Sequence, residues 1–186
     1  YFLPHFARQD DVGSGRQRLI IKFYTMKHIY FLLCMLAMAA SAHSQDYLKL
    51  MSYNIRNAKG MDNVRNVQRI ANVINNEAPD VVAVQELDSM TTRSNQTYVL
   101  AEIAERTQMH ASYAPAISFQ GGKYGIGILF KEKPLDIQTF PLPGREEERM
   151  LMVAEFKDYF FACTHLSLTE EDRLASLEII KNSVCN

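Results

Sequence analysis

Hydrophobic and polar positions alternate along the chain in patterns that change from strand-like to helix-like and back. Residues 47–53 alternate imperfectly and predict a first strand. Apolar residues then recur every three or four positions from about 63 to 77, so we expect a helix over these residues that is capped by Asp62 and stopped by Pro79. Val81–Val84 is a continuous apolar run that is too short for a helix, and it predicts a strand buried on both faces.

The same alternation continues to the end of the sequence. A second helix is predicted near 96–107, and a last helix is expected to begin at Thr169, where Asp172 stands three residues on. Leu174, Leu177 and Ile180 are the apolar positions of this last helix. Between the second and the last helix we expect five strands, at 111–117, 124–130, 135–140, 150–156 and 159–164.

These elements predict an α/β fold (α+β) that mixes two kinds of strand pairing. The opening strand, helix and strand indicate a crossover between parallel strands, whereas five strands with short connections indicate hairpins. The sum is a pair of stacked sheets with helices outside them. The length of 186 residues allows about one domain. A hydrophobic content of 47% and a charged content of 22% are typical of a globular chain.

The segment 26–42 has the order of a secretory signal peptide. A short basic start is followed by twelve mostly apolar residues and the small-residue sequence Ala40-Ser41-Ala42. We therefore expect export to the periplasm or the medium, with a mature chain that begins at His43. A buried core helix and a lipid anchor on Cys34 are the alternatives. We interpret residues 1–25 as a leader that is not native or was mis-called, with Met26 as the true start.

Charge, hydropathy and cysteine content exclude several classes of protein. Residues 1–42 hold five basic and two acidic residues, so 15 basic and 19 acidic residues remain, a net charge of −4. Phosphate contacts supply most non-specific affinity for nucleic acid, and a mildly acidic chain disfavours it. No window holds the ~20 apolar residues that a spanning helix needs. Three cysteines are too few for a disulfide scaffold, and the pairing of Cys163 with Cys185 stays open.

Residues with useful chemistry stand at predicted strand ends. Asn54 ends the first strand in Tyr53-Asn54-Ile55, and Glu86 follows the buried run in Val84-Gln85-Glu86. The carboxyl ends of strands are where α/β proteins assemble their sites. For each residue taken singly, the alternative interpretation is that Asn54 only starts a turn and that Glu86 is a solvated loop carboxylate. Three further stretches favour a site instead: Tyr124-Gly125-Ile126-Gly127, Glu148-Arg149 and Thr164-His165-Leu166.

In this order the five motifs resemble the endonuclease/exonuclease/phosphatase superfamily. This superfamily of metal-dependent phosphoesterases includes pancreatic deoxyribonuclease, neutral sphingomyelinases and inositol polyphosphate 5-phosphatases. The resemblance covers residues 47–182. It implies a four-layer αββα sandwich of two mixed sheets with the site at one rim, incomplete in this chain.

The resemblance implies a metal site at the ends of the first strands. Glu86 matches the glutamate that binds the catalytic Mg²⁺, for which Mn²⁺ is the alternative ion, and Asn54 matches the asparagine beside it. Mg²⁺ takes oxygen ligands and keeps several waters, so one or two carboxylates suffice. At such a site the ion polarises a phosphoryl oxygen.

The resemblance also implies a phosphate site. His165 matches a residue that donates a hydrogen bond to the scissile phosphate, and Arg149 and Tyr124 would support phosphate binding. Each has an alternative. His165 could be a structural histidine, Arg145 competes with Arg149, and Tyr124 could simply pack.

One departure from the superfamily pattern concerns the attacking water. The superfamily continues with Gly-Asp-x-Asn and Ser-Asp-His motifs that supply the general base, and these motifs do not occur in this sequence. We therefore expect residues 43–186 to be the amino-terminal part of the domain, with the carboxyl-terminal half missing and this fragment inactive alone.

The predicted function is an exported Mg²⁺-dependent phosphoester hydrolase, either a phosphodiesterase or a phosphatase. The alternative is a non-catalytic or vestigial binding module of the same fold. The substrate is expected to be a phosphoester of a lipid headgroup, a sugar or a nucleic acid. We expect a monomer with no integral membrane span.

Overall fold

The computed structural model describes residues 27, 28, 30, 31 and 47–185. The chain divides after Tyr47 into two units, and every strand described belongs to the second unit, Leu48–Asn186. The predicted leader, 1–25, and most of the predicted signal peptide, 26–42, lie outside the described residues. Within the described part of the chain, no helix is both long enough and apolar enough to cross a membrane.

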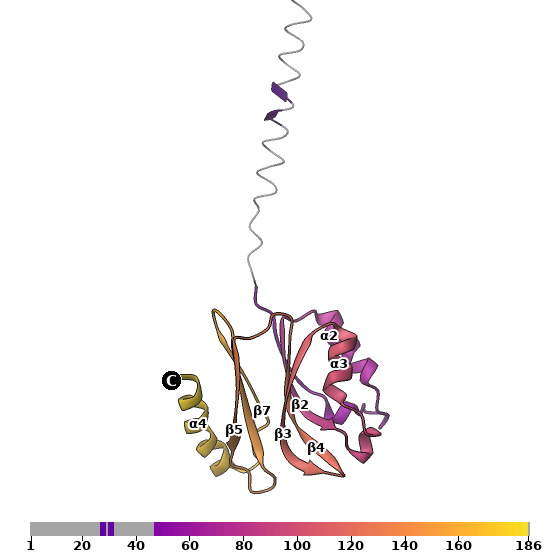
Figure 1. Ribbon diagram of the computed structural model, residues 1–186, viewed down its shortest axis with the longest axis vertical. Coiled ribbons are helices and arrows are strands. Elements are labelled where there is room, and N and C mark those ends of the chain that lie inside the picture. Colours follow the sequence, from indigo (N-terminus) through magenta and orange to yellow (C-terminus); the bar gives the residue numbers. More distant parts are fainter. Residues whose placement is uncertain (1–26, 29, 32–46, 186) are drawn as a thin grey trace, which may run out of the picture. The chain divides into compact units, whose positions relative to one another are not determined.

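Two β-sheets form the centre of the second unit (Figure 1). The first sheet has the strand order β1-β2-β4-β3, in which β1 and β2 run parallel and the other pairs run antiparallel. The second sheet has the order β5-β6-β7 and is antiparallel among the described strands. The strands are β1 (Leu50–Asn54), β2 (Val81–Ser89), β3 (His110–Phe119), β4 (Gly122–Phe130), β5 (Asp136–Leu142), β6 (Arg149–Glu155) and β7 (Phe160–Thr164).

Helices cover the outer faces of both sheets, so the unit has the predicted αββα order. In Figure 1, α2 (Val67–Glu77) and α3 (Val99–Thr107) lie on the first sheet, and α4 (Glu170–Cys185) lies on the second. Two short 3₁₀ helices, η1 (Arg56–Ala58) and η2 (Thr92–Ser94), follow β1 and β2. The predicted four-layer fold class is confirmed.

Strand β2 is buried on both faces, as its apolar run predicts. Val82 and Val84 belong to the core under α2 and α3. Val81 and Ala83 belong to the core between the sheets, where they join Met152 of β6. Because full burial of such a side chain is worth roughly 1.5–3 kcal/mol, both sides of β2 contribute to stability.

Two glycines of β4 permit close packing, Gly127 against helix α3 and Gly125 against strand β3. A Cβ atom at Gly127 would lie 2.5 Å from Leu100 Cδ2 and 2.9 Å from Leu87 Cδ1. A Cβ atom at Gly125 would lie 2.1 Å from the carbonyl oxygen of Ala114 in the neighbouring strand. Both glycines are therefore required by packing.

Helix α2 begins four residues later than the sequence pattern predicts. Asn63 has a left-handed backbone with φ of 61°, which an α-helix does not accommodate. The Asp62 carboxylate accepts a hydrogen bond from Val64 N–H and pairs with Arg69. Asn66 caps the helix instead, because its side chain accepts from Arg69 N–H. The predicted cap at Asp62 is wrong.

Helix α3 also begins later than predicted, at Val99. Asn95 and Gln96 both have left-handed backbones, with φ of 54° and 56°. Tyr98 precedes the helix and gives no side-chain cap. The first turn of this helix is therefore held by packing of Val99, Leu100 and Ile103 on the sheet.

The start of α4 is close to its predicted place, but Asp172 does not contact the backbone of Thr169. The Asp172 carboxylate accepts from Arg145 N–H and pairs with the Arg145 guanidinium. The N–H of Thr169 donates to Ser167 Oγ. Asp172 thus joins α4 to the loop before β6.

The apolar face predicted for α4 is only partly correct. Leu174 and Leu177 are 57% and 54% exposed. Ile179 and Ile180 pack against the cluster of Leu142, Leu151 and Val153 on the second sheet. The helix has apolar residues on two sides, so its sequence did not reveal which side faces the sheet.

Replacing Ile103 by alanine tests the core under α3. Ile103 is fully buried, so Ile103→Ala should lower the free energy of unfolding by about 2–5 kcal/mol in urea denaturation. Leu177→Ala is the control on an exposed helix position, and its effect should stay within about 0.5 kcal/mol. A large loss from Leu177→Ala would contradict the described orientation of α4.

Candidate active site

A β-bulge in β2 sets the position of Glu86. Val84 pairs with Gly127 and Leu87 with Gly125, so Gln85 and Glu86 together lie opposite a single residue of β4. Glu86 has φ of 59°, a left-handed conformation that is uncommon for a residue with a side chain. Glu86 was predicted to stand at the end of this strand, and that prediction is wrong, because β2 continues to Ser89 beyond the bulge.

Asn54 holds the Glu86 carboxylate from the adjacent strand. Asn54 Nδ2 donates to Glu86 Oε1 at 2.7 Å. Asn54 Oδ1 accepts from the backbone N–H of Arg56 at 3.0 Å, which fixes the amide orientation. The parallel register of β1 and β2 places Asn54 opposite Gln85, next to Glu86. The two predicted metal-site residues are therefore brought together.

Arg149 lies at the start of β6 and is almost fully buried, with 6% of its surface exposed. Its Nη1 donates to Glu147 Oε1 at 2.5 Å, and its Nη2 donates to Glu146 Oε1 at 3.3 Å. The same Nη1 lies 3.4 Å from Nδ1 of His165. Among the described residues, Arg149 Nε finds no hydrogen-bond acceptor. Arg149 thus retains one buried donor.

His165 follows β7 and shares a small pocket with Arg149 and Tyr124. Burial lowers the pKa of His165, and the nearby Arg149 charge lowers it further, against smaller opposing effects of Glu86 and Glu147. The imidazole is therefore neutral at pH 7. Since Nδ1 faces an arginine donor, the proton of the neutral ring belongs on Nε2.

Tyr124 of β4 lies in the same pocket. Burial raises the pKa of its phenol, and the negative charges of Glu86 and Glu147 raise it further. Tyr124 is therefore a neutral hydrogen-bonding group at any ordinary pH. The negative charge of Glu86 raises the pKa of both Tyr124 and His165, which is consistent with a Glu86 carboxylate that lies near the pocket of Arg149.

Arg145, the alternative to Arg149, lies elsewhere. Its guanidinium pairs with Asp172 at 3.1 Å and approaches Glu171 at 3.9 Å, both at the start of α4. The Asp172 contact raises the pKa of Arg145. The structure therefore assigns Arg145 to an ion pair that anchors the loop before β6, and Arg149 to the pocket.

Two acidic residues of this pocket region were not singled out by the sequence analysis. Glu146 accepts from the Ser167 hydroxyl with both oxygens at 2.8 Å, and also from Leu168 N–H. Glu146 thereby joins Arg149 to the segment that follows His165. Glu147 contacts Arg149 directly. The only signal in the sequence was the run of three glutamates before Arg149, which by itself indicates a solvated loop.

Arg93 is a third residue that the sequence analysis missed. It pairs with the buried Asp88 carboxylate through two hydrogen bonds of 2.8 and 2.7 Å. Its guanidinium lies 4.3 Å from the Phe119 ring centroid and 5.2 Å from that of Tyr124. These distances are typical of cation–π contacts. Arg93, held by Asp88 of β2, therefore packs against the Tyr124 ring.

The donor set of the Glu86 end suits a hard divalent cation. It consists of one carboxylate and one amide, and the described part of the chain contains no group of three or more His, Cys, Asp or Glu side chains that could hold a metal ion. Mg²⁺ commonly binds through one or two carboxylates and keeps several waters. The hydrogen bond from Nδ2 gives Asn54 the role of orienting the carboxylate. Direct ligation by Asn54 stays a prediction.

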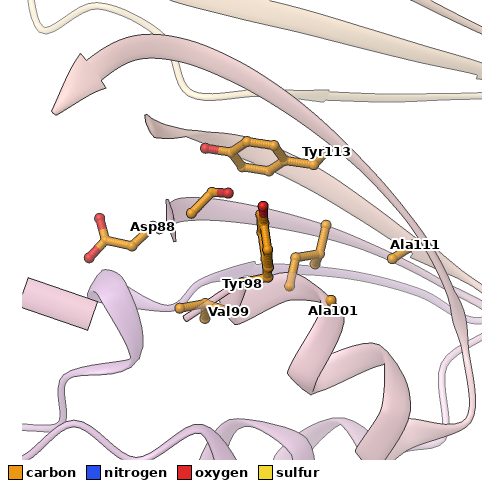
Figure 2. Close-up of a pocket in the computed structure, with 8 residues that line it drawn as sticks. Asp88, Tyr98, Val99, Ala101, Ala111 and Tyr113 are labelled. Atoms are coloured by element: carbon orange, nitrogen blue, oxygen red, sulfur yellow. The ribbon is translucent and has the colours of Figure 1, made fainter. Parts of the chain in front are cut away.

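A separate hollow of about 280 Å³ lies between β2, β3 and the start of α3. Figure 2 shows Tyr98 and Tyr113 beside this hollow, with the Asp88 carboxylate pointing away from both rings. Its lining is mainly apolar, and none of Asn54, Glu86, Tyr124, Arg149 and His165 contributes to it. The predicted site residues therefore belong to a different part of the molecule.

Comparison with known families gives one match. The sequence pattern described as the endonuclease/exonuclease/phosphatase family matches residues 51–175. This span contains all five predicted site residues. No curated protein matches the chain in sequence.

Several solved structures share the fold. An endonuclease/exonuclease/phosphatase of Beutenbergia cavernae is 22% identical with a TM-score of 0.58, over 72% of this chain and 43% of that chain. A mannosyl-6-phosphatase of Bacteroides thetaiotaomicron is 18% identical with a TM-score of 0.53, over 74% and 58%. TDP2 of D. rerio with a single-strand DNA product is 18% identical with a TM-score of 0.55, over 75% and 55%. The chain spans about half the length of these structures.

Replacing Ser167 by alanine tests the Glu146 anchor. Hydrogen bonds from Leu168 N–H and the Ser167 hydroxyl lower the pKa of Glu146 to about 2. Ser167→Ala should raise this pKa part of the way to its usual range, measured by ¹³C NMR titration of the carboxyl carbon. Ser183→Ala is the control, because the Ser183 hydroxyl donates to carbonyl groups of α4.

The lowered pKa also predicts the sign of an acid effect on stability. A carboxylate whose pKa is lower in the folded state stabilises the fold above its unfolded pKa, and this contribution is lost as pH falls through the folded value of about 2. The stability difference between wild type and Ser167→Ala should therefore shrink on acidification from pH 5 to pH 2. A difference that stays constant over this range would contradict the anchor.

Proposed function

The chain belongs to the endonuclease/exonuclease/phosphatase family, whose members are phosphoesterases, and we propose that it forms the metal- and phosphate-binding part of a Mg²⁺-dependent phosphoester hydrolase. The observation that carries this proposal is that two groups of side chains lie near each other. Asn54 and Glu86 lie on the first sheet, whereas Arg149 begins β6 and His165 follows β7. The Glu86 carboxylate is close enough to influence the pKa of His165. A carboxylate for a cation thus lies in the same electrostatic environment as a cationic pocket for an anion.

Glu86 would hold the divalent ion, with Mn²⁺ as an alternative to Mg²⁺. Asn54 fixes the carboxylate through Oε1, so the Glu86 side chain does not need to reorganise when the ion binds. The bound ion would supply charge neutralisation at the phosphoryl oxygens and an activated water.

Arg149, His165 and Tyr124 would bind and orient the phosphoryl group. Arg149 offers a cationic fork whose position is fixed by burial. Neutral His165 donates from Nε2, because its Nδ1 faces Arg149. Neutral Tyr124 donates from its hydroxyl. Donors held in place before the reaction stabilise the charge that develops in the transition state.

We further propose that the complete catalytic unit contains more polypeptide than this chain supplies. The support is that the chain spans about half the length of the structures that it matches. In addition, β1 and β7 are outer strands of their sheets and line a common hollow of about 460 Å³ with Gln85 and Cys163 on its walls. Additional strands beside β1 and β7 would cover this hollow and could bring the base that deprotonates the attacking water.

The substrate class that we propose is a phosphoester of a sugar, a lipid headgroup or a nucleic acid. A sugar phosphatase and a protein bound to a DNA product are among the structures of this fold. Export remains a proposal that rests on the order of residues in 26–42. A monomeric state is likewise a prediction. If the metal binds and no phosphoester is hydrolysed by a completed protein, the binding-module alternative is favoured.

Glu86→Gln tests the metal site. The amide keeps an acceptor for Asn54 Nδ2 and removes the negative charge, so Mn²⁺ affinity should fall by roughly tenfold or more in calorimetric titration. In a protein completed to the length of its structural relatives, turnover should fall by roughly a hundredfold or more. Glu102→Gln is the control, because Glu102 pairs with Arg106 on α3. Unchanged Mn²⁺ binding in Glu86→Gln would remove the basis of the proposal.

His165→Ala separates the phosphate site from the metal site. The imidazole donates to the phosphoryl group in our proposal, so turnover of the completed protein should fall by roughly a hundredfold or more. Mn²⁺ affinity should change by less than about twofold, because Asn54 and Glu86 are untouched. A parallel loss of Mn²⁺ affinity would instead assign His165 to the metal.

A further inference from the structure

The Arg149 pocket already contains an anion from the chain itself. Glu147 Oε1 accepts from Arg149 Nη1 at 2.5 Å, and the same nitrogen lies 3.4 Å from His165 Nδ1. Glu147, Arg149, His165 and Tyr124 all line one pocket. The carboxylate therefore lies among the three side chains that would bind a phosphoryl group.

The pocket has no room for a phosphate while Glu147 is in place. Its free volume is only about 10 Å³, which is space for about one water molecule. A phosphate with its four oxygens is larger than this. Entry of a phosphoryl group requires the Glu147 side chain to leave.

The loop that carries Glu147 is anchored by the two residues before it, and these anchors do not involve the Glu147 side chain. Arg145 is tied to Asp172, and Glu146 is tied to Ser167 and Leu168. The hydrogen bond that the structure gives the Glu147 side chain is the one from Arg149. Rotation of this side chain would exchange one Arg149 contact for water without loosening the anchors.

We propose that Glu147 occupies the phosphate position as an intramolecular competitor, so that a phosphoryl group binds Arg149 only after it displaces this carboxylate. This inference rests on the assignment of Arg149 and His165 to phosphate under the proposed function. Each phosphate ester must displace the same carboxylate, so the competitor lowers the affinity for phosphomonoesters and for phosphodiesters by the same factor.

The test is anion binding without metal and without turnover. The full chain is titrated in the presence of EDTA with methyl phosphate and with dimethyl phosphate, followed by ³¹P and protein NMR. Glu147→Gln should bind both anions more tightly than wild type, by roughly tenfold or more.

Two variants control for charge and for position. Glu105→Gln removes an exposed carboxylate of α3 that does not line the pocket, and it should change either affinity by less than about twofold. The double variant Glu147→Gln with Arg149→Gln should lose the gained affinity. A wild-type chain that binds neither anion while Glu147→Gln binds both would support the proposal, because the competitor would then be dominant.

Other results of the same titrations would contradict the proposal that Glu147 is a competitor. If Glu147 only holds Arg149 in place, Glu147→Gln will bind each anion with the same affinity as wild type or with lower affinity. Absence of binding in every variant, or retained binding in the double variant, would also exclude the competitor. The proposed function has a separate readout, since Mn²⁺ affinity depends on Glu86 and is measured without these anions.

Discussion

Burial of β2 on both faces is the constraint on which the rest of the structure depends. Val82 and Val84 face two helices, and Val81 and Ala83 face the second sheet. A strand in this position has no solvated face, so a charged side chain must leave it at an end or at a break in its pleat. The bulge at Gln85 and Glu86 provides the break, and the left-handed backbone of Glu86 is the local strain that this arrangement requires.

The candidate site exists only because two sheets are stacked. β1, β2 and β4 contribute Asn54, Glu86 and Tyr124, while the second sheet contributes Arg149 at the start of β6 and His165 just after β7. The core between the sheets therefore fixes the distance between Glu86 and the pocket of Arg149. The Ser167 hydroxyl and Leu168 N–H donate to the Glu146 carboxylate, and these hydrogen bonds hold the segment after His165 against the loop before β6.

Charge balance explains how Arg149 can be almost fully buried. An unpaired buried guanidinium would be very costly, and here Glu146 and Glu147 lie on either side of it. The two carboxylates differ in their other contacts. Glu146 accepts hydrogen bonds from Leu168 N–H and from the Ser167 hydroxyl, whereas Glu147 accepts a hydrogen bond from Arg149. One carboxylate is thus structural, and the other is free to exchange with a substrate anion in our proposal.

The sequence alone determined those features that depend on neighbours along the chain. The apolar run 81–84 predicted a strand buried on both sides, periodic positions predicted three helices, and the motifs around Asn54, Glu86 and His165 predicted the family and its fold. Tertiary structure decided which carboxylates serve the helix ends, because Asp62 pairs with Arg69 and Asp172 pairs with Arg145. It also decided the bulge at Glu86, the buried side of α4 and the roles of Glu146 and Glu147. These depend on contacts between segments such as Glu146 and Ser167, 21 residues apart, and no local pattern records which of several glutamates will meet a buried arginine.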